Sequence, residues 1–400
     1  MKILWVKSGT LFPPDTGGRR RTLAMLREIT RAGHTLHYLG LKPDSLPITP
    51  EEQTDPYAQT KEWVTSHEPA HSSPRFFLHL IKNLLFSRQP YVLDRYRSAA
   101  WRQRIIESAA HADLVICDFL TPAPHFEDLA LGKPTYLFQH NIEAQIWKRL
   151  ADSAKNPLKR AYLRSQHHRM ARAEKHLSTL FDGVITVSPD DTTYCREHYH
   201  LTNVLGHVPT GVDITAFRPA PHPPAIPTIG FLGSMDWIPN IEGIHWFLRE
   251  VLPLVRKSLP TVRLKIIGRN PPATLRDLPL TDPAIEVTGT VPDVQPHVHD
   301  CTLIAVPLLA GGGTRIKIFE AMAMGIPVVS TTIGAEGLPL TPGTDLQIAD
   351  SPPAFAKSLL TLLKDPALTA TLATHARHRM ETDFTWAAAT HHFLHLLTRQ

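Results

Sequence analysis

The sequence predicts an α/β fold with two doubly wound domains, each built on a parallel sheet with helices on both faces. Along the whole chain, short apolar runs rich in β-branched residues alternate with longer helical patterns, an order typical of parallel sheets. The length of 400 residues exceeds what one hydrophobic core usually organises. A proline-rich stretch over residues 207–227 divides the chain near its middle.

Short segments with the composition of buried strands recur in both halves of the chain. In the first half we expect strands near residues 2–7, 35–39, 113–117, 135–138 and 183–187. In the second half we expect them near residues 228–233, 262–267, 285–287, 303–306 and 327–330. Each half therefore supplies the strands of one sheet.

The proline-rich stretch predicts the domain boundary, because proline cannot continue a helix or the middle of a sheet. We expect an N-terminal domain over residues 1–208, a linker over 209–227, a C-terminal domain over 228–384 and a final helix over 385–400. This helix could pack against either domain, including back on the first one. Ligands of parallel sheets bind beyond the carboxyl ends of the strands, so two such domains facing one another predict a cleft as the binding site.

The composition is that of an ordinary globular protein, with 42% hydrophobic and 20% charged residues. No apolar run approaches the roughly 20 residues that a membrane span needs, and the N-terminus does not resemble a cleavable signal. The cysteines Cys117, Cys195 and Cys301 are odd in number and far apart, which argues against disulfides and against a zinc site. We expect a cytoplasmic protein, and because the 23 histidines are scattered, no metal site.

The positive charge lies in the first half of the chain. Residues 1–205 hold 27 Lys and Arg against 21 Asp and Glu, a net charge of +6, whereas residues 206–400 hold 15 against 16. Such a surface could contact anionic lipid, a phosphate-bearing substrate or nucleic acid. The apolar segment 76–86, which has basic flanks, suits either a core helix or a shallow membrane contact.

The most informative segment follows the predicted strand over residues 303–306, where a glycine loop leads into a predicted helix over 314–324. Glycines let the backbone approach a ligand closely, and the free N–H groups at a helix start attract a phosphate. Arg315 and Lys317 add positive charge, and Glu320 could accept hydrogen bonds from a ribose. The alternative is a flexible loop before an ordinary surface helix. The candidate binding residues in the loop and at the helix start are Gly311, Gly312, Gly313 and Thr314.

A second glycine loop, over residues 12–18, follows the first predicted strand and precedes a predicted helix over 19–32. It contains Gly17 and Gly18 but not the Gly-x-Gly-x-x-Gly pattern of dinucleotide-binding domains. A Gly-Gly turn alone is weak support for a ligand site. Its position at the predicted cleft makes it a candidate.

Taken in order, several segments resemble the family 4 retaining glycosyltransferases, which have the GT-B fold of two Rossmann-like domains. Sugar transferases of exopolysaccharide gene sets are especially similar in pattern. The resemblance implies that the N-terminal domain lies on the acceptor side and that the C-terminal domain binds the nucleotide sugar. The matching segments are residues 12–18, 140–147, 209–213, 231–240, 311–325 and 330–337.

The resemblance assigns roles to residues that match the family's motifs. Glu320 corresponds to the second glutamate of a Glu-x7-Glu motif, which holds the donor ribose. Gly17 and Gly18 match the loop that approaches the diphosphate, and His140 matches a histidine near the transferred sugar. Without the resemblance, His140 would more simply be a structural histidine.

The sequence also departs from the family's pattern. The first glutamate of the Glu-x7-Glu motif falls at Gly312. The family's diphosphate clamp, a Gly-Arg pair with a downstream lysine, is here Gly233-Ser234 with Asn240. An arginine can replace it because its planar guanidinium binds phosphate oxygens in a bidentate manner. The candidate replacements are Arg315 and Lys317, followed by Arg269.

The resemblance implies a retaining hexosyltransferase that moves a sugar from a nucleotide diphosphate sugar, with UDP or GDP as the nucleotide, to a hydroxyl acceptor. A glycan or lipid-linked acceptor in cell-surface polysaccharide or glycolipid synthesis is implied. The basic first half adds a peripheral contact with the anionic inner membrane face. We expect catalysis without metal or bound cofactor, because loop amides and cations can stabilise the leaving diphosphate. The predicted catalytic residues are His140, Arg315 and Lys317.

Two other interpretations stay open. A nucleotide-sugar epimerase or a phosphorylase with the GT-B fold would share the glycine loops. A basic nucleic-acid-binding protein would explain the charge of the first half. No recognised nucleic-acid motif accompanies that charge, so we do not expect a nucleic-acid partner.

Overall fold

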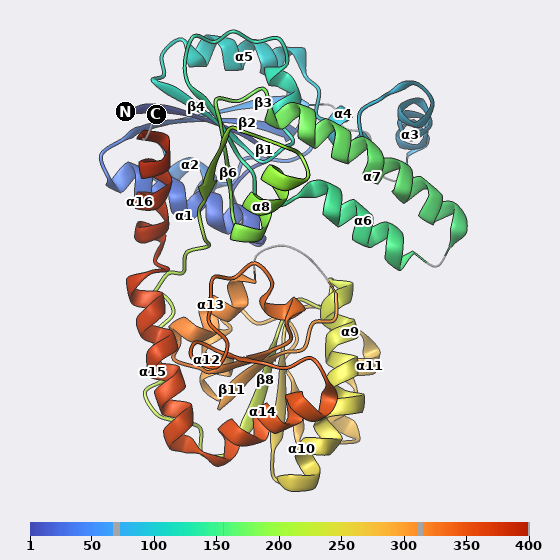
Figure 1. Cartoon of the computed structure of the whole chain (residues 1–400), viewed down its shortest axis with the longest axis vertical. Coiled ribbons are helices and arrows are strands. Elements are labelled where there is room, and N and C mark those ends of the chain that lie inside the picture. The colour runs from blue at the N-terminus through green and yellow to red at the C-terminus, as the bar shows by residue number, and fades with distance from the viewer. Residues whose placement is uncertain (67–72, 155, 311–314, 399–400) are drawn as a thin grey trace. The chain divides into compact units, whose positions relative to one another are not determined.

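A computed structural model describes residues 1–66, 73–154, 156–310 and 315–398 of the chain (Figure 1). The chain forms two compact units, which we call unit 1 and unit 2. Unit 1 comprises Met1–Val208 and Thr390–Gln400, and unit 2 comprises Pro209–Ala389. Each unit contains one parallel sheet, which confirms the predicted α/β fold with two doubly wound domains.

Unit 1 is built on a seven-stranded sheet of order β3-β2-β1-β4-β5-β6-β7, in which all neighbouring strands are parallel. The chain order reverses between β1 and β4, which places a switch point at the carboxyl ends of these strands. The strands are β1 (Lys2–Ser8), β2 (Thr35–Pro43), β3 (Thr60–Ser66), β4 (Leu114–Asp118), β5 (Thr135–Phe138), β6 (Gly183–Thr186) and β7 (Val204–His207). The helices are α1 (Gly17–Arg31), α2 (Pro50–Thr54), α3 (Pro74–Phe86), α4 (Tyr91–Asp94), α5 (Ala99–Ala109), η1 (Ala123–Phe126), α6 (Glu143–Ser153), α7 (Pro157–Ser178) and α8 (Pro189–Glu197), and the last helix, α16 (Trp386–Thr398), ends in this unit.

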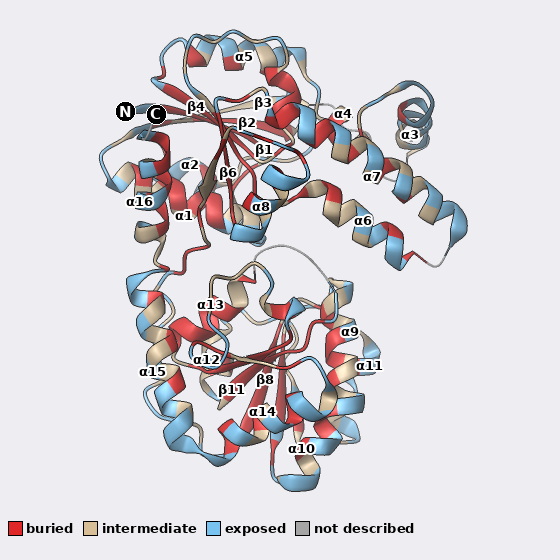
Figure 2. Ribbon diagram, viewed as in Figure 1, coloured by how far each residue is buried: buried red, intermediate tan, exposed pale blue. Residues whose placement is uncertain are grey.

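The central strands of unit 1 are apolar because helices cover both faces of the sheet. Trp5 of β1 is fully buried and packs against Phe138 of β5 and Phe393 of α16, at ring centroid distances of 6.3 and 5.8 Å. Figure 2 shows buried strands beneath helices whose outer faces are exposed. The contact with Phe393 fixes the end of the chain on unit 1.

All strands predicted for the first half are present within a few residues, but β3 and β7 were not predicted. Both lie at the edges of the sheet. The side chains of β3 are mostly polar and half-buried, and β7 is four residues long and contains Gly206. An edge strand therefore lacks the continuous apolar run on which the prediction relied.

Unit 2 is built on a six-stranded sheet of order β10-β9-β8-β11-β12-β13, again with parallel neighbours. Its switch point lies between β8 and β11. The strands are β8 (Thr228–Leu232), β9 (Arg263–Ile267), β10 (Ile285–Val287), β11 (Leu303–Val306), β12 (Val328–Ser330) and β13 (Gln347–Ile348), of which only the two-residue β13 was not predicted. The helices are α9 (Ile238–Trp246), η2 (Phe247–Val251), α10 (Leu252–Ser258), α11 (Ala273–Arg276), η3 (Leu278–Leu280), α12 (Gln295–His299), α13 (Ile316–Ala323), η4 (Ile333–Ala335), α14 (Pro352–Lys364) and α15 (Pro366–Thr382).

The apolar segment 76–86 lies within α3, and the exposure of its side chains bears on the core-helix interpretation. Large apolar side chains along this helix remain accessible, so α3 is not a core helix. Its inner side is tied to α7, where Arg169 donates hydrogen bonds to the carbonyl oxygens of Asn83 (2.9 Å) and Leu84 (2.7 Å). The accessible side chains are Phe77, Leu78, Ile81, Leu84, Leu85 and Phe86.

A buried carboxylate from α7 caps the start of α6, whose own N-cap residue, Ile142, offers no side-chain cap. Glu174 accepts hydrogen bonds from the N–H groups of Glu143 (2.7 Å) and Ala144 (3.0 Å). It also accepts from the Gln139 amide (2.6 Å) and the Tyr199 hydroxyl (2.7 Å). Burial nevertheless outweighs these bonds and raises the pKa of Glu174 to about 7.

The raised pKa of Glu174 predicts a pH-dependent contribution to stability. The folded state binds a proton more tightly than the unfolded state, so this contribution is fully present below about pH 4.5 and is lost as pH rises through 7. Replacing Glu174 by Gln removes the titration. Urea unfolding measures the free energy of unfolding at pH 5 and at pH 8. Between these two pH values, the free energy of unfolding of the parent should fall by up to about 3 kcal/mol more than that of Glu174→Gln. An identical difference at both pH values would contradict this assignment.

Candidate functional site

The predicted site residues lie at the carboxyl ends of the two sheets, near the switch points. Those in unit 1 are Gly17, Gly18 and His140. Those in unit 2 are Gly233, Arg269, Arg315, Lys317 and Glu320. The predicted phosphate-binding residues of the glycine loop and helix start, Gly311, Gly312, Gly313 and Thr314, lie outside the described residues.

In unit 2, the loops that follow β8 and β9 approach each other so closely that two glycines are required. The N–H of Gly233 donates to the carbonyl oxygen of Ile267 (2.9 Å). A Cβ atom at Gly268 would lie 1.8 Å from the carbonyl oxygen of Gly233, and one at Gly233 would lie 2.8 Å from the Asn240 amide. The close approach brings Asn240, on α9, against the end of β8.

Lys317 extends from the first turn of α13 to the same point. Its ammonium donates to the carbonyl oxygen of Leu232 and to Oδ1 of Asn240, both at 3.0 Å. Although part of the side chain remains accessible, the ammonium points inward. Burial, assisted by the charge of Arg315 and opposed by that of Glu320, lowers the pKa of Lys317 to about 7.

Arg315 and Glu320 are buried on either side of Lys317 along the chain, with exposed fractions of 4% and 6%. The guanidinium of Arg315 lies 5.2 Å from the ring centroid of Trp237, which precedes α9, a cation–π distance. Glu320 stands one turn along α13 from Lys317. The structure therefore brings the start of α13 and the loop before α9 together, as a shared phosphate site would need.

Arg269 differs from Lys317 in its electrostatic surroundings. Its Nε donates to Oγ of Ser234 (3.1 Å) and to the carboxylate of Asp236 (2.8 Å). Asn270 donates to the other oxygen of Asp236 (2.8 Å), and these bonds lower the pKa of Asp236. Arg269 is thus neutralised by a carboxylate that the sequence prediction missed, whereas the two bonds of Lys317 go to neutral oxygens.

In unit 1, the predicted His140 lies beside a buried carboxylate that was not predicted. Asp118 ends β4, and its Oδ1 lies 2.7 Å from Nε2 of His140. Lys7 lies 3.1 Å from Oδ2, which also accepts hydrogen bonds from Trp5 (3.0 Å) and Thr22 (2.7 Å). Burial alone would raise the pKa of Asp118, but Lys7 and His140 hold it well below its usual range.

His140 is neutral near neutral pH, because burial lowers its pKa to about 4 despite the nearby Asp118. In the neutral imidazole only one ring nitrogen carries a proton, and a proton on Nε2 can be donated to the carboxylate of Asp118. Nδ1 is then a hydrogen-bond acceptor. Phe119 stacks on the imidazole at a centroid distance of 3.8 Å. A Cβ atom at Gly18 would lie 2.5 Å from the Phe119 ring, so Gly18 and His140 contact the same side chain. Gly17 begins α1 next to it.

Sequence reasoning missed Asp118, Lys7 and Phe119 in this cluster. A signal was available, since Lys7 and Asp118 end or directly follow predicted strands and so fall at the carboxyl edge of the sheet. Phe119 has φ of 72°, which is uncommon for an aromatic residue and has no sequence signature.

Several other findings concern the described ranges as a whole. They contain no helix that is long and apolar enough to cross a membrane. They also contain no group of three or more His, Cys, Asp or Glu side chains arranged to hold a metal ion. Cys117, Cys195 and Cys301 are each buried and unpaired.

Comparison with known proteins gives matches for both units. Residues 226–365 match the family of glycosyl transferases group 1. An uncharacterised 44.6 kDa protein in the cps region of Klebsiella pneumoniae is 22% identical over 386 residues, which covers 91% of each chain. A GDP-mannose-dependent monoacylated alpha-(1-6)-phosphatidylinositol monomannoside mannosyltransferase of Corynebacterium glutamicum is 29% identical over 203 residues, or 45% of this chain and 52% of that protein.

Solved structures match along the whole chain. TarM superposes with a TM-score of 0.73 at 12% identity, covering 100% of this chain and 99% of that one. Sucrose-phosphate synthase from Thermosynechococcus elongatus gives 0.71 at 16% identity, covering 98% of each. Anabaena HepE in complex with UDP gives 0.64 at 14% identity, covering 100% of each. At these identities the likeness shows the fold alone.

Proposed function

We propose that this chain, which is a group 1 (GT4) glycosyltransferase with the GT-B fold, transfers a sugar from a nucleotide diphosphate sugar to a hydroxyl acceptor with retention of configuration. The observation that carries the proposal is the buried ammonium of Lys317 beside Asn240, where the resemblance expects a phosphate-binding lysine. The donor is a UDP or GDP sugar. This choice is supported by the bound UDP of HepE and by the GDP-mannose dependence of the Corynebacterium relative.

The cations of unit 2 suit the charge that develops during transfer. The leaving nucleoside diphosphate gains one negative charge as the glycosidic bond breaks, and fixed cations can stabilise that charge without metal. Arg315 and Lys317 supply these cations in our proposal, and Glu320 holds the ribose. The leaving phosphate takes the acceptor proton, so no protein nucleophile is needed. Gly17 and Gly18 approach the diphosphate, and Nδ1 of His140 accepts a hydrogen bond from the transferred sugar.

The acceptor belongs to cell-surface polysaccharide or glycolipid synthesis in our proposal. The relative in a capsular polysaccharide region and the phosphatidylinositol mannoside named for the Corynebacterium enzyme support this class. Transfer differs from the activity of an epimerase in one measurable way. An epimerase changes the donor sugar without an acceptor, whereas this chain should release the nucleotide only as the sugar reaches a hydroxyl group.

We further propose that α3 contacts an anionic membrane surface. Phe77, Ile81 and Leu85 lie four residues apart and are 55%, 53% and 66% exposed, which makes an apolar stripe along one side of the helix. The helix contains no Asp or Glu. Such a stripe suits shallow insertion at a lipid interface.

The charge around α3 favours anionic lipid over an acidic protein as its partner. The neighbouring helix α7 carries six Lys or Arg residues and one acid, Glu174, which is buried. Basic side chains beside an insertable apolar stripe match an anionic bilayer, which offers negative headgroups above hydrocarbon. The exposed basic residues of α7 are Lys159, Arg164, Arg172 and Lys175.

The membrane proposal predicts binding to anionic vesicles that combines charge and apolar contact. The parent should sediment with phosphatidylglycerol vesicles, bind neutral phosphatidylcholine vesicles less, and detach as salt screens the charges. Replacing Ile81 and Leu85 together by Asn should weaken binding at least about tenfold. Leu280→Asn, at an even more exposed apolar site in unit 2, is the control. Parent-like binding of the double variant, or capture only by acidic proteins, would refute membrane insertion.

The ribose assignment is tested by Glu320→Gln, which keeps the size of the side chain and removes its charge. Loss of charge-assisted hydrogen bonds to the ribose should weaken nucleotide affinity by about tenfold to a hundredfold. Calorimetric titration with UDP and GDP measures the affinity, and Glu250→Gln, an exposed carboxylate of unit 2, serves as the control. If Glu320→Gln bound every nucleotide as tightly as the parent, Glu320 would not hold the ribose.

The pKa of Lys317 predicts that donor binding depends on pH. Phosphate favours the protonated ammonium, so affinity should be highest below pH 7 and should fall as the free lysine loses its proton above about 7. A decrease of roughly tenfold is expected between pH 6.5 and pH 8.5. A nucleotide sugar is the suitable probe, because its diphosphate does not titrate in this range. Lys317→Arg should give a flat profile, and a flat profile for the parent would remove Lys317 from the site.

A further inference from the structure

The loop between β1 and α1, residues 9–16, is held at its start by side chains from other elements. The N–H groups of Leu11 and Phe12 both donate to Oε2 of Glu52, at 2.8 and 2.7 Å. The hydroxyl of Tyr38, on β2, donates to the carbonyl oxygen of Gly9 (2.9 Å). The backbone groups of Gly9, Leu11 and Phe12 therefore have fixed partners before the chain reaches Gly17.

Glu52 is fully buried and has a third donor. The hydroxyl of Tyr57 donates to Oε1 at 2.6 Å. Burial raises the pKa of Tyr57 far above its ordinary value, so this hydroxyl stays protonated and remains a donor. Burying a carboxylate destabilises the fold unless hydrogen-bond donors surround it. Two of these three donors to Glu52 are backbone N–H groups of the loop.

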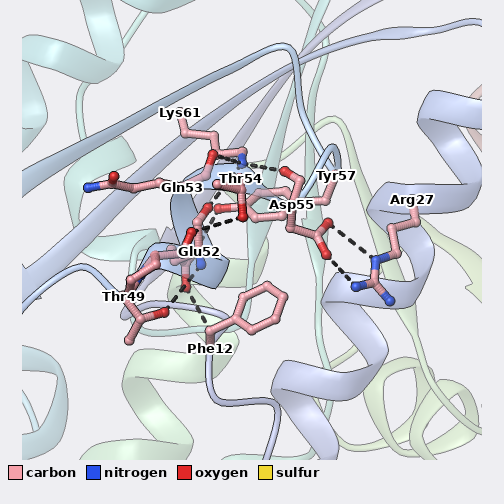
Figure 3. A network of polar contacts seen from close by, with 10 residues as sticks. Phe12, Arg27, Thr49, Glu52, Gln53, Thr54, Asp55, Tyr57 and Lys61 are labelled. Atoms are coloured by element: carbon pink, nitrogen blue, oxygen red, sulfur yellow. Dashed lines mark hydrogen bonds and ion pairs between the residues drawn. The ribbon is translucent and has the colours of Figure 1, made fainter.

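The helix that carries Glu52 is itself held in place (Figure 3). Lys61 of β3 donates to the carbonyl oxygens of Glu52 (3.0 Å) and Gln53 (2.9 Å), and to that of Asp55. Asp55, directly after α2, pairs with Arg27 of α1. Helix α2 thus holds the loop before Gly17 through Glu52, and the residue directly after α2, Asp55, holds α1 itself.

We propose that Glu52 is a positioning residue for sugar transfer. Its carboxylate fixes the backbone of Leu11 and Phe12, and thereby the position of the first turn of α1, which begins with Gly17 and Gly18. The inference rests on the proposed function, which assigns contact with the diphosphate to this turn. Small displacements of groups that must meet a reacting substrate cost large factors in rate, so α2 contributes to turnover without touching the substrate.

The test separates turnover from nucleotide binding in Glu52→Gln, which keeps the shape of the side chain and removes its charge. Turnover, kcat, should fall about tenfold to a hundredfold. Affinity for the nucleoside diphosphate should fall by a clearly smaller factor than kcat, since Arg315, Lys317 and Glu320, which we propose hold most of the nucleotide, lie in unit 2. Tyr57→Phe, which removes one donor and leaves both backbone bonds, should fold normally and lower kcat by a smaller factor.

Ile105→Val, a buried apolar change in the same unit, controls for loss of stability. Parent-like kcat in Glu52→Gln, or a decrease no larger than that of Ile105→Val at equal thermal stability, would overturn the inference. Hydrogen exchange gives a readout that does not depend on activity. The amides of residues 9–18 should exchange faster in Glu52→Gln than in the parent, and equal exchange would also overturn it. A parent that transfers no sugar would refute the proposed function alone.

Discussion

The buried ammonium of Lys317 is the interaction on which the site in unit 2 depends. A buried charge must be surrounded by hydrogen-bond partners, and here they are the carbonyl oxygen at the end of β8 and the side chain of Asn240. That requirement draws α13 and α9 to the same strand end. It also explains why Gly233 has no room for a side chain. While it is protonated, a lysine held by neutral oxygens has its charge available for a phosphate, which a lysine paired with a carboxylate does not.

In unit 1, buried carboxylates rather than a buried ammonium hold segments near the predicted site residues in place. Asp118, Glu52 and Glu174 are all fully buried carboxylates, and each fixes a segment at or near the carboxyl edge of the sheet. Asp118 orients His140, Glu52 holds the start of the loop before α1, and Glu174 caps the helix that follows His140. The backbone around the predicted site residues is therefore fixed by electrostatics rather than by apolar packing alone. Substitutions at these carboxylates should act on geometry first.

The fold was largely predictable because central parallel strands must be apolar on both faces. Edge strands such as β3 were not predicted, because their side chains are partly exposed to solvent and mostly polar, so the apolar pattern is absent there. In the site, Lys317 and Glu320 were predictable from their closeness to the glycine loop. The place of Asp118 at the carboxyl edge of the sheet was also available from its predicted strand. The contacts of Asp118 and Glu52 were not predictable, because their partners lie far away in the sequence: Trp5 is 113 residues from Asp118, and Leu11 is 41 residues from Glu52. Only the sheet topology brings such pairs together.

The central claim is that unit 2 binds a nucleotide sugar at Lys317. It is tested most directly by thermal unfolding of the full chain with a panel of UDP, GDP, ADP and dTDP sugars. A ligand that binds only the folded state raises stability by mass action, by about 2.7 kcal/mol at a hundredfold excess over Kd. The account predicts a concentration-dependent rise in Tm with at least one of these donors, and loss of that rise in Lys317→Met. No rise with any donor, or the same rise in the variant, would contradict it.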